Sequence, residues 1–312
     1  MTRLTAIFLL VTALLAGSAG AAAPEEEVKQ EDKAYTAFQL GRYLTAQREA
    51  LPLAEKGDRA AQTLLGELYS KGLGVRLDFG EAAKWYRLAA AQGDREAQFA
   101  LGLLLLNGKG VKRDAEEAIR QLQGAADQGH DLAQYNLGLL YVEGLVVARD
   151  VAKAAQYFRA AAEQGHGEAQ YGLGTLYAEG AGVPRDPMAA AQWIGRAAEK
   201  GISDAELDFG ILVFKGRGVQ KDEARGAAFL RRAAEHGNPV AQNRIAHLYV
   251  NGRGVLIDPV EAAKWHLIAR QEGKSDTWLD GYLETLSKEQ QSKAAAAARD
   301  WLRARHAGFF DG

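Results

Sequence analysis

The sequence predicts an all-α protein, an α/α superhelical solenoid built from six copies of a 36-residue helix pair. The pair Ala-Gln at 61–62 recurs at 97–98, 133–134, 169–170 and 241–242, and Ala205-Glu206 fills the remaining place. The Gly-x-Gly-Val of residues 72–75 and the Asp at 78 return with the same period. A constant short period is typical of solenoids, in which each unit buries its apolar face only against its neighbours. The predicted copies are 58–93, 94–129, 130–165, 166–201, 202–237 and 238–273.

Each copy has the pattern of two helices. In the first copy, Asp58 is a good N-cap, and apolar residues with helical spacing follow it. Gly72 ends this first helix, because glycine adopts the left-handed conformation at low cost. Asp78 is expected to cap the second helix in a reciprocal capping box with Glu81.

Recurring small and aromatic residues indicate how the helices pack. Gly66 returns at 102, 138, 174 and 210 inside first helices, where glycine costs about 1 kcal/mol relative to alanine. We therefore expect two helix backbones to approach closely there. Trp85, Trp193 and Trp265 share one repeat position and are expected in the core. Trp278 and Trp301, near the C-terminal end, are also expected to be buried.

The flanking segments have their own patterns. Residues 1–21 combine a positive start, an apolar run of about 12 residues and small residues, which predicts a signal peptide cleaved near Ala21. The alternative, a membrane anchor, needs about 20 apolar residues. Residues 22–33 are interpreted as a linker, 34–57 as an N-terminal capping helix pair and 274–312 as C-terminal capping helices. Ser287 and Gln290 predict a capping box for a long final helix. The signal peptide predicts a periplasmic or secreted protein. Lipid attachment at the cleavage site is not expected, because no cysteine is present.

The repeat resembles a known family. Residues such as Ala61-Gln62, Leu65-Gly66, Leu68-Tyr69 and Ala82-Ala83-Lys84-Trp85-Tyr86 are similar to those of a Sel1-like repeat, a relative of the tetratricopeptide repeat. The resemblance implies a superhelix with a concave groove that acts as an adaptor for a protein or an extended peptide. Such relatives include periplasmic signalling regulators, parts of envelope polysaccharide assemblies and host-contact proteins. Relatives linked to β-lactam handling are rich in cysteine, whereas this chain has none.

The composition and motifs favour binding over catalysis. The chain has 38 basic and 40 acidic residues, so a nucleic-acid partner is not expected. Phosphate-binding, dinucleotide-binding, zinc-protease and serine-hydrolase motifs are absent from the sequence, and we expect no catalytic residue, metal or cofactor. His130 and His166 share a repeat position, but a metal site would need a third ligand. The favoured interpretation is two helix-start residues that face solvent.

The candidate binding residues lie where the copies disagree. On first helices, positions three and four apart share one face, and in related solenoids that face lines the groove. The predicted partner-binding residues of this concave face, centred on the later repeats, are Tyr135, Asn136, Glu143, Tyr171, Glu179, Asp208, Lys215, Arg244, His247 and Asn251. The alternative is an envelope polysaccharide-binding accessory or a hydrolytic enzyme that uses groove carboxylates such as Asp208 or Glu179, which would require two convergent carboxyl groups.

Overall fold

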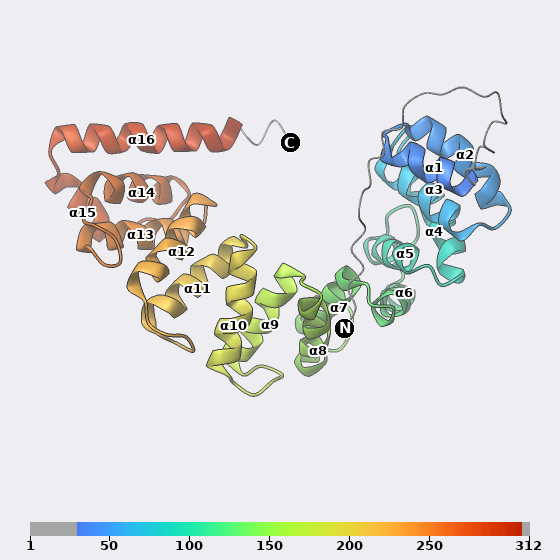
Figure 1. The fold of residues 1–312 in the computed structure, drawn as a ribbon, viewed down its shortest axis with the longest axis horizontal. Coiled ribbons are helices and arrows are strands. Elements are labelled where there is room, and N and C mark those ends of the chain that lie inside the picture. The colour runs from blue at the N-terminus through green and yellow to red at the C-terminus, as the bar shows by residue number, and fades with distance from the viewer. Residues whose placement is uncertain (1–29, 308–312) are drawn as a thin grey trace, which may run out of the picture.

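A computed structural model describes residues 30–307, and all regular structure in that part of the chain is helical. Figure 1 shows the helices following one another along an open arc, from α1 at one end to α16 at the other. The first helices of the six repeats are α3 (Arg59–Lys71), α5 (Arg95–Asn107), α7 (Asp131–Glu143), α9 (Gly167–Glu179), α11 (Ser203–Lys215) and α13 (Pro239–Asn251). The second helices are α4 (Phe79–Ala91), α6 (Ala115–Asp127), α8 (Val151–Glu163), α10 (Pro187–Glu199), α12 (Glu223–Glu235) and α14 (Pro259–Gln271). The predicted all-α repeat fold is confirmed.

Two helices precede the repeats and two follow them. They are α1 (Gln30–Gln39) and α2 (Tyr43–Glu55) at the start, and α15 (Thr277–Thr285) and α16 (Lys288–Ala307) at the end. Helix α1 begins at Gln30, inside the segment that the sequence predicted to be a linker. The proposed signal peptide, residues 1–21, lies outside the described residues. None of the helices described is long and apolar enough to cross a membrane.

The aspartate caps form as predicted, but the reciprocal contact does not. Asp58 accepts a hydrogen bond from the Ala61 N–H at 2.7 Å, and Asp78 accepts from the Glu81 N–H at 3.1 Å. The Asp78 N–H donates to the carbonyl of Tyr69 at 3.0 Å, so it is not free for Glu81. The same bond joins Asp114 to Leu105 and recurs in every later repeat, where it ties the start of the second helix to the end of the first.

The capping box of the final helix is confirmed. The Ser287 N–H donates to Gln290 Oε1 at 3.0 Å, and the Gln290 N–H donates to Ser287 Oγ at 3.2 Å. Together these bonds satisfy two backbone donors that an uncapped helix would leave free. The sequence therefore fixes the start of α16 locally.

The glycines inside first helices make room for a large side chain in every one of these repeats, and for the second backbone in only some of them. A Cβ atom on Gly66 would lie 2.6 Å from the Tyr86 ring, and one on Gly138 would lie 2.5 Å from the Phe158 ring. Both rings come from the second helix of the same repeat. The predicted backbone approach occurs in repeats four and five, where a Cβ on Gly174 would lie 2.9 Å from the Ile194 backbone nitrogen and one on Gly210 would lie 3.0 Å from the Gly226 carbonyl oxygen. The glycine therefore sets how deeply the second helix packs into the first.

The tryptophans divide into buried and exposed residues. Trp85 and Trp265 are buried as predicted, whereas Trp193 is half-buried with the Arg196 guanidinium 4.4 Å from its ring centroid. Trp301 is partly buried and packs edge-on against Trp265 at 5.7 Å. The prediction for Trp278 is wrong, because this side chain is 51% exposed. It lies on α15 and stacks on His247, whereas the neighbouring Leu279 is the residue of α15 that is buried in the core of the last repeat.

The recurring glutamine joins consecutive repeats. Gln62 Nε2 donates to the Ala54 carbonyl at 3.0 Å, at the end of the preceding second helix. Gln92 in turn donates to Gln62 Oε1 at 2.8 Å. Equivalent bonds to the preceding helix are made by Gln134, Gln170 and Gln242. A buried amide without a hydrogen-bond partner costs free energy. Each of these glutamines therefore favours the stacking in which its repeat places it against the preceding helix.

Repeat five replaces this amide by a buried carboxylate. Glu206 is fully buried, and Arg232 Nη2 lies 2.9 Å from its Oε1 atom. The same Arg232 nitrogen donates to the Ala198 carbonyl at 3.1 Å, which is the bond that a glutamine makes in other repeats. His236 Nδ1 lies 2.7 Å from Oε2 and must donate, because an ionised carboxylate only accepts. The arginine thus supplies the donor that the carboxylate lacks.

The packing between repeats two and three is thinner than elsewhere. Its cluster of buried apolar residues consists of Leu122, Ala125, Ala126, Ala133 and Leu137, fewer than in the other clusters. In other repeats the second loop glycine lies against the backbone at the start of the preceding second helix, and a Cβ on Gly110 would lie 2.2 Å from Phe79.

Val146 occupies the glycine position in repeat three, and its side chain prevents the same close approach. Figure 1 shows the row of helices changing direction between α6 and α7, at this junction.

Candidate partner-binding site

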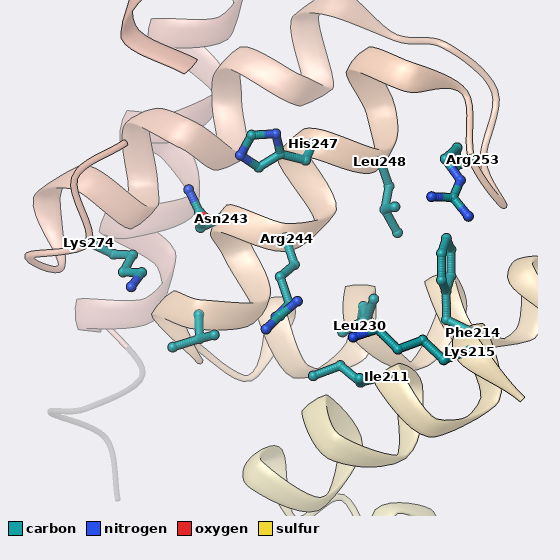
Figure 2. Close-up of a pocket in the computed structure, with 11 residues that line it drawn as sticks. Ile211, Phe214, Lys215, Leu230, Asn243, Arg244, His247, Leu248, Arg253 and Lys274 are labelled. Atoms are coloured by element: carbon teal, nitrogen blue, oxygen red, sulfur yellow. The ribbon is translucent and has the colours of Figure 1, made fainter. Parts of the chain in front are cut away.

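A pocket with a cavity volume of about 440 Å³ lies between repeats five and six. Its lining comes chiefly from α11 and α13, and Figure 2 shows the Lys215 and Arg244 side chains reaching into the space between these helices. The apolar part of the lining consists of Ile211, Phe214, Leu230, Val240 and Leu248. The polar part consists of Lys215, Asn243, Arg244, His247, Arg253 and Lys274. We call this site the basic pocket.

Among the described side chains, three cations of the basic pocket have no ion-pair partner, although the Asp208 charge acts on one of them, Arg244. No carboxylate is among its lining residues, and within residues 30–307 no acidic oxygen lies within 4.0 Å of the charged nitrogens of Lys215, Arg244 or Lys274. Arg253 differs, because it pairs with Glu223 at 2.7 Å. Hydrogen bonds from Arg253 and Lys221 lower the pKa of Glu223 to about 2, so this pair stays ionised at neutral pH.

Helix α15 holds His247 in place at the edge of the pocket. His247 Nε2 lies 2.8 Å from Asp276 Oδ2, and the Asn243 amide donates to the same oxygen at 2.9 Å. The Trp278 ring stacks on the imidazole at 4.9 Å. Burial alone would raise the pKa of Asp276, but hydrogen bonds from Asn243, His247 and the Leu279 N–H hold it well below its usual range. Asp276 therefore remains an anion that orients two lining residues.

Tyr171 and Asp208 form a polar link from α9 to α11 beside the pocket. The Tyr171 hydroxyl donates to Asp208 Oδ2 at 2.9 Å. Burial raises the pKa of Asp208, the Tyr171 bond and the charge of Arg244 oppose this shift, and Asp204 adds to it. Burial and the Asp208 charge also raise the pKa of Tyr171, so the hydroxyl keeps its proton. Tyr171 and Asp208 thus contact each other, and Asp208 lies close enough to Arg244 for that charge to lower its pKa.

The remaining predicted residues do not gather at one point. The Tyr135 ring stacks on His166 at 4.6 Å and packs near Phe158, so repeat stacking uses much of it. The amides of Asn136 and Asn251 donate to carbonyls of their own helices. Glu143 and Glu179 are exposed at the ends of α7 and α9. The structure places Lys215, Arg244 and His247 in the basic pocket, and partner binding by any of the ten residues stays a prediction.

The two histidines in the same repeat position do not face solvent as expected. His130 is buried, and its Nδ1 atom accepts from the Ala133 N–H at 3.3 Å, which makes it the N-cap of α7. His166 caps α9 in the same way at 3.2 Å. Each imidazole also packs against an aromatic ring of the preceding repeat, His130 against Phe99 at 4.5 Å and His166 against Tyr135 at 4.6 Å. In the part of the chain that is described, no three His, Asp or Glu side chains lie together as a metal site would require.

Sequence reasoning missed Phe214, Arg253 and Lys274. Phe214 is the largest residue at a position held elsewhere by Ser70, Leu106, Val142, Ala178 and Val250, which was a usable signal. Lys274 stands where the six repeats place a helix N-cap, and the following helix starts only after Asp276. These residues meet because of how repeats five and six stack, which no single repeat reveals.

The family model for the Sel1 repeat matches residues 59–94, 95–130, 131–166, 167–202, 203–238 and 239–274. This chain belongs to the Sel1 repeat family. Each matched Sel1 repeat begins one residue later than the copies defined above. Sel1 repeat proteins generally mediate protein–protein interactions.

Solved Sel1 structures agree with the fold. A Sel1 repeat protein from Oxalobacter formigenes is 32% identical, with a TM-score of 0.67 over 77% of this chain and 96% of the other. A protective antigen with this fold from uropathogenic Escherichia coli is 29% identical, with a TM-score of 0.60 over 88% of this chain and 68% of the other. A comparison with curated proteins gave no significant match.

Proposed function

We propose that this chain is a non-enzymatic interaction scaffold or regulatory adaptor whose first-helix face binds a protein partner, mainly through repeats four to six. The observation that carries the proposal is the basic pocket, whose apolar floor is bordered by Lys215, Arg244 and Lys274, three cations without an ion-pair partner among the described residues. Arginine and aromatic residues are frequent binding hot spots. A partner that extends from Tyr171 to Lys274 would cover several repeats, enough for a standard interface of roughly 1,600 Å².

The hydrolytic alternative receives no support from the carboxylates that the sequence suggested for it. Asp208 is engaged by Tyr171, whereas Glu179 is exposed at the far end of α9. Glycoside hydrolysis requires two carboxyl groups that flank one bond. We therefore propose binding without catalysis.

We further propose that the chain acts in the periplasm or outside the cell, in signalling or in envelope and exopolysaccharide assembly. The charged, apolar and small-residue order of residues 1–21 motivates this location. N-terminal sequencing of protein from a periplasmic extract should give a mature chain that begins near residue 22. An intact Met1 in a membrane fraction would contradict this location.

The binding face is tested by affinity capture from the native envelope, followed by mass spectrometry. The combined variant Tyr171→Phe with Arg244→Ala should lose the captured partner and remain folded by circular dichroism, although its melting temperature falls because Asp208 loses the Tyr171 hydrogen bond and the nearby Arg244 charge. The phenyl ring keeps the packing of Tyr171 while it removes the hydroxyl. Arg87→Ala, an exposed residue on the second helix α4, is the control and should capture normally. Capture lost only in the Arg87 variant would place the site on the opposite face.

A further inference from the structure

We propose that the basic pocket recognises an acidic peptide segment, in which an apolar side chain contacts the pocket floor and neighbouring Asp or Glu side chains pair with the cationic rim. This inference rests on the proposed function and names the chemistry of the partner.

The charge pattern of the pocket selects for carboxylates. Lys215, Arg244 and Lys274 come from α11, α13 and the segment after α14, so they approach the cavity from different sides. Their charges are not paired within residues 30–307, although the whole sequence is slightly acidic. A carboxylate that replaces water beside these groups gains a charge-assisted hydrogen bond, and the guanidinium can hold two oxygens at once.

The floor of the pocket requires an apolar group as well. Five aliphatic or aromatic side chains form it, and Phe214 is further covered by the Arg253 guanidinium at 4.7 Å. The cavity volume of about 440 Å³ falls in the range of ligand sites and has room for one large apolar side chain with its backbone. An inorganic anion or a polysaccharide acid would leave this floor in contact with water, at a cost proportional to the apolar area.

The surrounding acids tune the pocket without closing it. Asp276 holds Asn243 and His247, while Glu223 holds Arg253, so these lining residues are positioned before a partner arrives. Asp208 acts on Arg244 through its charge but is hydrogen-bonded to Tyr171 instead. Arg244 therefore remains available to an incoming carboxylate, and pre-positioned neighbours lower the entropic cost of binding.

The test uses fluorescence anisotropy with labelled peptides that are acetylated and, except for one comparison peptide, amidated. The probe contains an Asp-Leu-Asp core between glycines. The comparison peptides carry Asn-Leu-Asn, Asp-Ser-Asp, or Asn-Leu-Asn with a free C-terminal carboxylate. We expect the Asp-Leu-Asp peptide to bind at least tenfold more tightly than each of the others, and to weaken as salt is added.

Matched variants locate the binding. Lys215→Glu and Arg244→Glu should each weaken the Asp-Leu-Asp peptide at least tenfold. Lys71→Glu changes the residue at the same position of repeat one, which is also exposed, and should leave binding unchanged. Melting temperatures of all three variants check folding.

The outcomes separate the two proposals. Equal binding of the Asn-Leu-Asn peptide, or unchanged binding by Arg244→Glu, would overturn the acidic-peptide inference. Binding of only the free-carboxylate peptide would also overturn it, in favour of a chain terminus. If the peptides fail while Tyr171→Phe with Arg244→Ala still abolishes envelope capture, the binding face stands and only the partner chemistry is wrong. If capture survives in that variant, the proposed binding face itself is wrong.

Discussion

Replacing Arg232 with alanine tests the carboxylate that repeat five buries in place of an amide. Glu206 is fully buried, so the variant leaves its charge with His236 as the remaining partner and leaves the Ala198 carbonyl without its donor. Removing one partner of a buried ion pair typically costs 3–5 kcal/mol. Because the Arg232 side chain is 38% exposed, water can enter where it stood. We therefore expect a loss near the lower limit, about 3 kcal/mol.

A second substitution should reverse most of that loss. Glu206→Gln in the Arg232→Ala background restores the residue of the other repeats, and its Nε2 can donate to Ala198 as Gln170 donates to Ala162. The double variant carries no buried charge. We therefore expect its free energy of unfolding to lie within about 1 kcal/mol of that of the natural chain, the scale of one net hydrogen bond. The two substitutions should thus couple strongly, as residues of one network do.

Urea unfolding followed by circular dichroism measures both free energies, and amide hydrogen exchange in α11 and α12 shows where the change occurs. Arg87→Ala, an exposed arginine of another second helix, is the control and should change stability by less than about 0.5 kcal/mol. A loss of less than about 1 kcal/mol in Arg232→Ala, or a double variant no more stable than the single one, would show that Glu206 does not depend on Arg232.

Three further predictions use unfolding measurements. Trp265→Ala should lower the free energy of unfolding by about 3–5 kcal/mol because the ring is buried. Trp193→Ala, at the same repeat position, should lower it clearly less because this ring is only half-buried. Equal losses would contradict this difference. Gly281→Ala, in open space on α15, should gain about 0.5–1 kcal/mol of stability, whereas Gly210→Ala should lose about 1–3 kcal/mol against Leu230; the same sign for both would be inconsistent with the packing. Asp208→Asn should raise the melting temperature at neutral pH, because burial raises the pKa of Asp208 and its ionisation therefore costs stability as pH rises. That gain should shrink as the pH falls and Asp208 is protonated, so a gain that grows on acidification would show the opposite sign.

Local features of this fold are readable from the sequence because local chemistry determines them. The N-caps at Asp58 and Asp78 and the capping box at Ser287 depend on residues within one turn. The reciprocal contact of Glu81 fails because Tyr69, nine residues before Asp78, supplies a competing carbonyl. Local patterns therefore place the helices but not every bond between them.

Features that depend on stacking are harder to predict. The exposure of Trp278 follows from how α15 lies on repeat six, and the aromatic identity of the residue carries no information about that placement. The basic pocket combines residues of repeats five and six with Lys274, which follows α14. The variable positions on first helices therefore identified only Lys215, Arg244 and His247 of its polar lining. Tyr135 shows the converse, because a variable residue on the expected face is largely used in packing against His166.

The thin packing between repeats two and three has a mechanical consequence. In a solenoid each repeat contacts only its neighbours, so no other contact can brace a weak junction. Val146 and the small cluster around Leu122 therefore make the α6–α7 junction the compliant element of the arc. Four repeats and α16 lie beyond this junction. Because the basic pocket is far from it along the arc, a small rotation at the junction produces a large displacement of the pocket relative to α1.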